Sequence, residues 1–118
     1  MKYLLSIAFV IVSTAADARS WQSDYPSCNV RQQREVQESG RNRLRDHIAT
    51  RANVLQADIS TASKARPIPA KTLRHLWSRV DQIRKASDRT AAKQGFLSAA
   101  ERTTYDRRLD AVAGQLCR

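Results

Sequence analysis

Three apolar stripes with the spacing of an α-helix are the feature that most constrains the fold of this 118-residue chain. Within each stripe, apolar residues recur mostly every three or four positions, which places them on one face of a helix. Pro67 and Pro69 separate the first stripe from the second, and Gly95 separates the second from the third. Both kinds of residue end helices. The stripes are Leu44, Ile48, Ala52, Leu55, Ile59 and Ala62; Leu73, Leu76, Trp77, Val80 and Ile83; and Tyr105, Leu109, Val112 and Leu116.

This pattern predicts an all-α fold with helices over residues 41–63, 70–93 and 98–116. No segment alternates apolar and polar residues as a half-buried strand would. Ser98 and Glu101 have the spacing of a capping box, which marks the start of the third helix. Three amphipathic helices joined by short turns pack most simply as an antiparallel three-helix bundle. We therefore expect residues 41–118 to form one helical bundle domain.

The first residues have the organisation of a secretory signal peptide. Lys2 provides a positive charge, Tyr3 to Val12 form an apolar run, and Ala16-Asp17-Ala18 is a small-x-small cleavage site. The apolar run is about ten residues long, whereas a membrane-spanning helix needs about 20. We expect residues 1–18 to be cleaved after Ala18, and the mature chain to be a periplasmic or secreted protein that does not span a membrane.

The two cysteines, Cys28 and Cys117, lie near the two ends of the predicted helical region. Disulfides persist in exported proteins, and bridged Cα atoms lie within about 7 Å of each other. An unbroken helix over residues 30–63 would be about 50 Å long and would carry Cys28 away from Cys117. We therefore predict a turn near Gly40, with residues 19–40 forming a lead-in and a short fourth helix or strap, and a disulfide closing the fold. The alternative is two free thiols, one of them available to bridge two molecules.

No set of residues has the spacing of a catalytic, cofactor or metal site. His47 and His75 lack an HExxH pattern and a cysteine partner, so we predict two surface or boundary histidines. Asp106 and Asp110 share a helix face, but arginines surround them in the sequence, so we predict a solvated charge lattice. Ser98 has no adjacent base, and its capping role accounts for it. The interpretation is a protein that is not an enzyme and needs no cofactor.

Positive charge is the main indication of function. The chain has 21 Lys and Arg against 11 Asp and Glu, a formal net charge of +10. Such an excess favours an anionic partner. Export disfavours nucleic acid, so the expected partner is an envelope or secreted protein, or an anionic cell-envelope polymer. The alternative is that arginine only keeps a small helical protein in solution. The candidate partner-binding residues are Arg41, Arg43, Arg45 and Arg51 in the segment "RNRLRDHIATR", with Trp21 and Tyr25 outside the stripes.

The segment "KQGFLSAAERTTYDRRLDAV" resembles a pattern found in small, uncharacterised exported helical proteins of Gram-negative bacteria. It is also similar to the Leu-Thr-x-x-Gln turns of Spy-type periplasmic chaperones, where Leu97, Ser98 and Glu101 match, with Ser and Glu in place of Thr and Gln. The resemblance implies a basic helical scaffold that shields unfolded or envelope proteins without ATP.

Three functions follow from these observations. The leading hypothesis is a non-enzymatic exported binding protein that uses a basic surface to engage a protein or an anionic envelope partner. The second is a specific inhibitor or immunity protein of an exported enzyme, which suits a small disulfide-stabilised domain. The third is a Spy-like periplasmic chaperone.

Overall fold

The structure is a computed structural model that describes residues 25–118, which are 80% helical and contain no strand. The predicted signal peptide and Trp21 lie outside these residues. The all-α fold class is confirmed for the described part of the chain. Its elements are a 3-10 turn, η1 (Pro26–Cys28), and the helices α2 (Val30–Glu35), α3 (Arg43–Ala65), α4 (Ala70–Gln94) and α5 (Ala99–Leu116).

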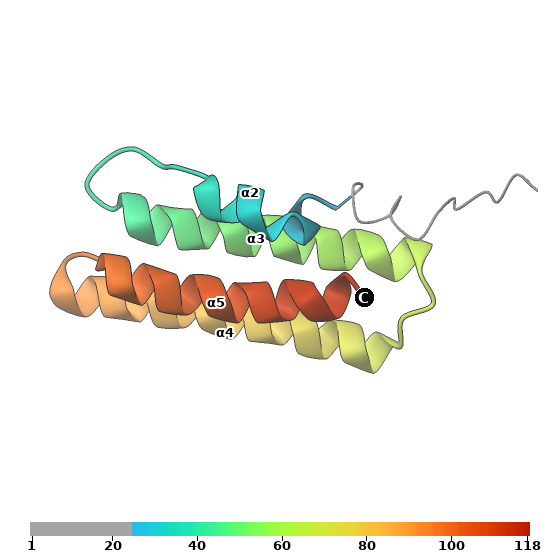
Figure 1. The fold of residues 1–118 in the computed structure, drawn as a ribbon. Coiled ribbons are helices and arrows are strands. Elements are labelled where there is room, and N and C mark those ends of the chain that lie inside the picture. Colours follow the sequence, from blue (N-terminus) through green and yellow to red (C-terminus); the bar gives the residue numbers. More distant parts are fainter. Residues whose placement is uncertain (1–24) are drawn as a thin grey trace, which may run out of the picture.

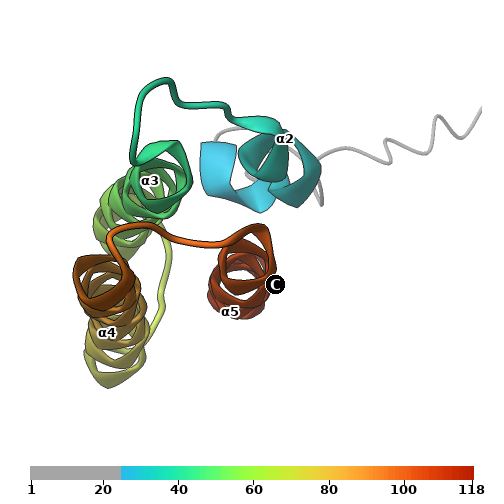
Figure 2. The same ribbon diagram turned by 90° about the vertical axis from the view of Figure 1, so that its left-hand side faces the viewer.

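The three long helices lie side by side, and the chain reverses direction between each and the next (Figure 1). Each of α3, α4 and α5 contacts the other two. The short helix α2 lies against α5, and η1 contacts both α3 and α5 (Figure 2). The N-terminal part of the described chain therefore covers the seam between α3 and α5, away from α4.

The connection between α4 and α5 has the local structure that its sequence predicts. Gly95 ends α4 with φ 82°, in the left-handed region that favours glycine. The Ser98 hydroxyl accepts a hydrogen bond from the Glu101 backbone N–H at 3.2 Å, and the Glu101 carboxylate accepts one from the Ser98 N–H at 3.1 Å. This completes the capping box. Leu97, between the two helices, is buried in the core.

The apolar stripes of the three long helices form one core. Its most deeply buried side chains include Ile48 and Leu55 on α3, Leu76 on α4 and Leu109 on α5. Trp77 is the exception: it is 44% exposed, so the prediction that it packs in the core is wrong. Successive residues of a helix point about 100° apart, and Leu76 already occupies the inward position.

The predicted disulfide is confirmed, since Cys28 and Cys117 are bonded with their Cα atoms 5.8 Å apart across a sequence separation of 89. The chain reverses between α2 and α3 through Gly40, which has φ 103°. Residues 36–42 connect the two helices, so α2 folds back beside α3 as the predicted strap (Figure 1).

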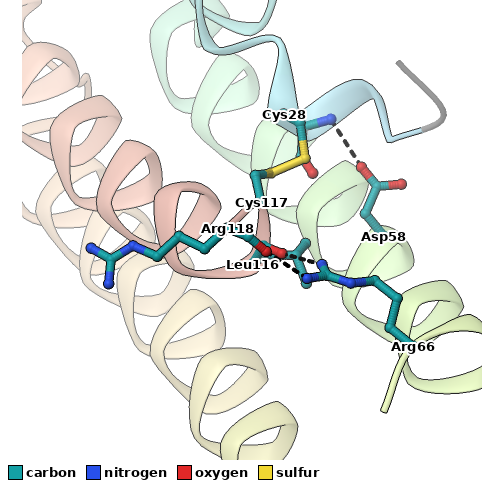
Figure 3. Close-up of a disulfide and its surroundings, with 7 residues drawn as sticks. Cys28, Asp58, Arg66, Leu116, Cys117 and Arg118 are labelled. Atoms are coloured by element: carbon teal, nitrogen blue, oxygen red, sulfur yellow. Dashed lines mark hydrogen bonds between the residues drawn. A yellow bond between two sulfur atoms is a disulfide. The ribbon is translucent and has the colours of Figure 1, made fainter. Parts of the chain in front are cut away.

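Two charged side chains lie near the disulfide: Asp58 on α3 and Arg66 just after the C-terminal end of α3 (Figure 3). The buried Asp58 accepts a hydrogen bond from the Ser27 backbone N–H at 2.9 Å, which fixes η1 on α3. Arg66, at the end of α3, donates to the carbonyl oxygens of Leu116 and Arg118. A guanidinium group at these carbonyls satisfies acceptors that the end of a helix leaves free.

Candidate functional site

Most carboxylates of the described residues form ion pairs or hydrogen bonds with other groups of the same chain. Asp81 pairs with two cations of its own helix, and Asp88 pairs with Arg45 at 3.0 Å. Glu101 serves the capping box and Asp58 holds η1. The remaining exposed cations therefore have few carboxylates left to neutralise them.

A buried charge cluster joins α2, α3 and α5. Its central group is the Asp106 carboxylate on α5, which is 5% exposed. His47 on α3 contacts it through Nε2 at 2.8 Å, and the Arg51 guanidinium donates to it at 2.8 Å. The second Arg51 Nη donates at 2.8 Å to Asp110, which also accepts from Arg34 on α2. One network of charged side chains therefore connects the strap to two long helices.

The His47 ring lies between two hydrogen-bond acceptors. Its Nδ1 atom lies 2.7 Å from the Val36 carbonyl oxygen, which can only accept a hydrogen bond. Its Nε2 atom faces the Asp106 carboxylate. Burial raises the pKa of Asp106, but hydrogen bonds from His47 and Arg51 together lower it further, so this pKa lies below its usual value. Both ring nitrogens of His47 face hydrogen-bond acceptors, one on the connection after α2 and one on α5.

This cluster corrects two predictions. His47 is 1% exposed and is not a surface or boundary histidine, and Asp106 belongs to a buried network and not to a solvated lattice. The reason is that α2 and its connection to α3 cover the seam where these side chains meet. A signal was present in the sequence: His47 and Arg51 on one helix, and Asp106 and Asp110 on another, are complementary charged pairs with the same i,i+4 spacing.

The predicted partner-binding residues differ in exposure and do not form one surface. Arg41 and Arg43 are exposed and form no ion pair within the described residues. Arg45 is partly exposed but pairs with Asp88. Arg51, 3% exposed, belongs to the buried cluster, and Tyr25 is buried in the core beneath η1, so neither lies on an accessible surface. Their placement in an exposed contact set was wrong, because Arg51 bonds to Asp106 and Asp110 and Tyr25 packs in the core.

Further basic residues lie on a different part of the surface. Within the described chain, these exposed cations form no ion pair with a carboxylate: Lys71, Arg74, Arg89, Lys93, Arg107 and Arg108. Arg89 and Arg108 belong to a hollow of about 430 Å³ between α4 and α5. A second hollow, of about 420 Å³ beside the end of α2, has Glu35 and Glu38 as well as arginines in its lining.

The described residues contain no group of three or more His, Cys, Asp or Glu side chains placed to hold a metal ion. None of the helices in residues 25–118 is both long enough and apolar enough to cross a membrane. Comparison with known proteins finds no matching family model, curated protein or solved structure. The resemblance of the Leu97–Glu101 turn to Spy-type chaperones therefore stays a prediction.

Proposed function

We propose that this chain is a non-enzymatic exported binding protein whose basic surface engages an anionic partner. One observation carries the proposal: the carboxylates are mostly used in the buried cluster, the helix cap and local ion pairs, whereas many arginines and lysines remain exposed and unpaired within the described part of the chain. The partner is an acidic protein or an anionic envelope polymer. A surface of this kind attracts either one by complementary charge.

The proposed scaffold is an antiparallel three-helix bundle with a short strap, closed by the Cys28–Cys117 disulfide. A disulfide of this kind persists in an oxidising compartment, which supports a periplasmic or secreted location after removal of residues 1–18. Helices joined by short connections and a covalent closure hold the exposed side chains at fixed positions. Fixed positions reduce the conformational entropy that binding must otherwise remove.

The test is direct binding of the disulfide-intact mature chain to anionic probes over a salt series. The probes are poly-L-glutamate and phosphatidylglycerol vesicles, with phosphatidylcholine vesicles as the uncharged reference. We expect binding to the anionic probes that weakens as salt is added, because salt screens exposed charges. Absence of binding to every anionic probe at low salt would leave solubility as the only role of the arginines.

A pull-down from a cell-envelope extract separates the other two functions. One protein retained in a one-to-one complex at high salt would favour the inhibitor or immunity protein. Many proteins retained loosely at low salt would favour the Spy-like chaperone, and the next measurement would be suppression of aggregation of an unfolded client.

A further inference from the structure

The charged side chains that line the hollow between α4 and α5 are all cationic. Three arginines, Arg79, Arg89 and Arg108, line it together with Gln82, Ile83 and Ala86, and no acidic side chain is among these residues. Elsewhere on α4, Arg84 and Lys85 share the carboxylate of Asp81. Arg79 and Arg89 of α4 therefore keep their charge without a carboxylate partner on the side that faces α5.

We propose that this hollow binds an acidic polypeptide segment of the partner, an inference that rests on the proposed function and locates its contact site. The occupant is a segment that carries several carboxylates along its length with apolar side chains between them. Three observations support this choice. They are the spacing of the arginines, the apolar atoms in the floor of the hollow, and the contacts that already order two of the arginine side chains.

The arginines are distributed along the hollow and do not converge on one point. Arg79 and Arg89 are ten positions apart on α4, which is about 15 Å along a helix axis. The Arg79–Gln115 hydrogen bond at 3.1 Å and the Thr90–Tyr105 hydrogen bond at 2.9 Å set the register of α4 against α5. Arg108 lies on α5 between these two contacts, so it faces the hollow between Arg79 and Arg89. Three cations in this arrangement fit an extended anionic chain better than a single small anion.

The floor distinguishes a polypeptide from other anionic chains. Ile83 and the partly buried Ala86 contribute apolar atoms to the floor between the arginines, beside the polar Gln82. A peptide can place a small apolar side chain there and its carboxylates on the rim. A chain of phosphates has no group that gains from this floor, because polar groups lose hydration against apolar atoms.

Two of the three arginine side chains are already held by contacts within the molecule. Gln115 accepts a hydrogen bond from Arg79, and the Arg108 guanidinium lies 5.5 Å from the centre of the Tyr105 ring. A cation at this distance over an aromatic ring is stabilised. Guanidinium groups bind carboxylates through two parallel hydrogen bonds, and a side chain that is already ordered loses less entropy on forming them.

The experiment compares two double charge reversals with the same change in net charge. Arg89→Glu with Arg108→Glu alters the hollow, and Lys64→Glu with Lys71→Glu is the matched control on exposed residues beside the α3–α4 connection, outside the lining of the hollow. The probe is a fluorescein-labelled peptide with Glu and Leu on opposite faces, and the readout is fluorescence anisotropy with the disulfide-intact mature chain. We expect the hollow variant to lose about tenfold or more in affinity and the control to lose about threefold or less.

A third variant tests shape at constant charge. Ala86→Phe keeps all three arginines but fills the hollow, so we expect weaker peptide binding with unchanged helix content by circular dichroism. If the two charge reversals weaken binding equally and Ala86→Phe has no effect, the hollow is not the site, although the proposed function stands. Tight binding to phosphatidylglycerol vesicles without binding of the peptide would replace the acidic segment with a membrane surface. If the parent chain binds none of the anionic probes, the proposed function itself fails.

Discussion

At the scale of single residues, the charged cluster around Asp106 holds a carboxylate that is removed from water. A carboxylate removed from water is stable only if donors replace its hydration, and here His47 and Arg51 do so. His47 lies between the Val36 carbonyl and the Asp106 carboxylate and thereby connects the end of α2 to α5. A network of this kind stabilises the fold only while every member is present.

Removing the charge of Asp106 tests this dependence. Asp106→Asn leaves the buried His47 and Arg51 side chains facing a neutral amide, so we expect a loss of about 3–5 kcal/mol in the free energy of unfolding. Asp88→Asn is the control, because its ion pair with Arg45 is exposed to solvent and is worth at most about 1 kcal/mol. The measurement is urea unfolding at neutral pH. Equal losses in the two variants would show that the cluster has no special role in stability.

The lowered pKa of Asp106 also predicts how stability depends on pH. A carboxyl group with a lower pKa in the folded state stabilises the fold at any pH above its unfolded value, 3.8 for Asp. That contribution is lost as the pH falls through the lower, folded pKa. Asp81, through hydrogen bonds from Lys85 and Arg84, and Glu101, through its bonds with Ser98 and Gln94, also have lowered pKa values and share this acid loss.

We therefore expect the free energy of unfolding to decrease below about pH 4. Asp106→Asn should decrease less steeply over the same range, because it lacks one of the titrating groups. Unfolding curves collected at a series of acidic pH values give both slopes. Parallel slopes would mean that Asp106 has the same pKa in the folded and unfolded chains.

At the scale of elements, the long helices and α2 are stabilised differently. α5 begins at a complete capping box. α2 has only six residues, too few for a helix to persist by itself. Its position depends on Arg34, on the Val36 carbonyl that follows it and on the disulfide that precedes it.

The cap of α5 gives a prediction at this scale. Ser98→Ala removes the acceptor for the Glu101 N–H, and we expect a loss of about 1 kcal/mol in stability. Hydrogen exchange should accelerate in the first turn of α5. Thr103→Ala is the control, since the Thr103 hydroxyl bonds only to the Ala99 carbonyl of its own helix, and its effect should stay within about 0.5 kcal/mol. A larger effect of the control than of Ser98→Ala would contradict the capping role.

At the scale of the whole molecule, the disulfide closes almost the entire described chain into one loop. A closure with a sequence separation of 89 stabilises the folded state by about 4–5 kcal/mol in the chain-entropy model. Cys28→Ser with Cys117→Ser should lose a comparable amount in urea unfolding. Hydrogen exchange in α2 should become fast, whereas the central turns of α4 stay protected. Equal acceleration in both helices would show that the disulfide supports the whole fold and not mainly the strap.

The helices of this protein and its covalent closure could be predicted from local features of the chain. The apolar spacing, Pro69, Gly95 and the Ser98 cap act within a few residues of chain, so the positions of α3, α4 and α5 could be predicted closely. The pairing of the two cysteines followed from chain length and the break at Gly40.

Which polar and aromatic side chains are buried depends on how the helices pack together. His47, Arg51 and Asp106 are individually ordinary residues of a charged helix surface, and Tyr25 precedes the first helix. His47, Arg51 and Asp106 are buried where η1 and α2 cover the seam of α3 and α5, whereas Trp77 on α4 remains exposed. Burial depends on the neighbours that folding brings together from distant parts of the chain, and local periodicity contains no information about them.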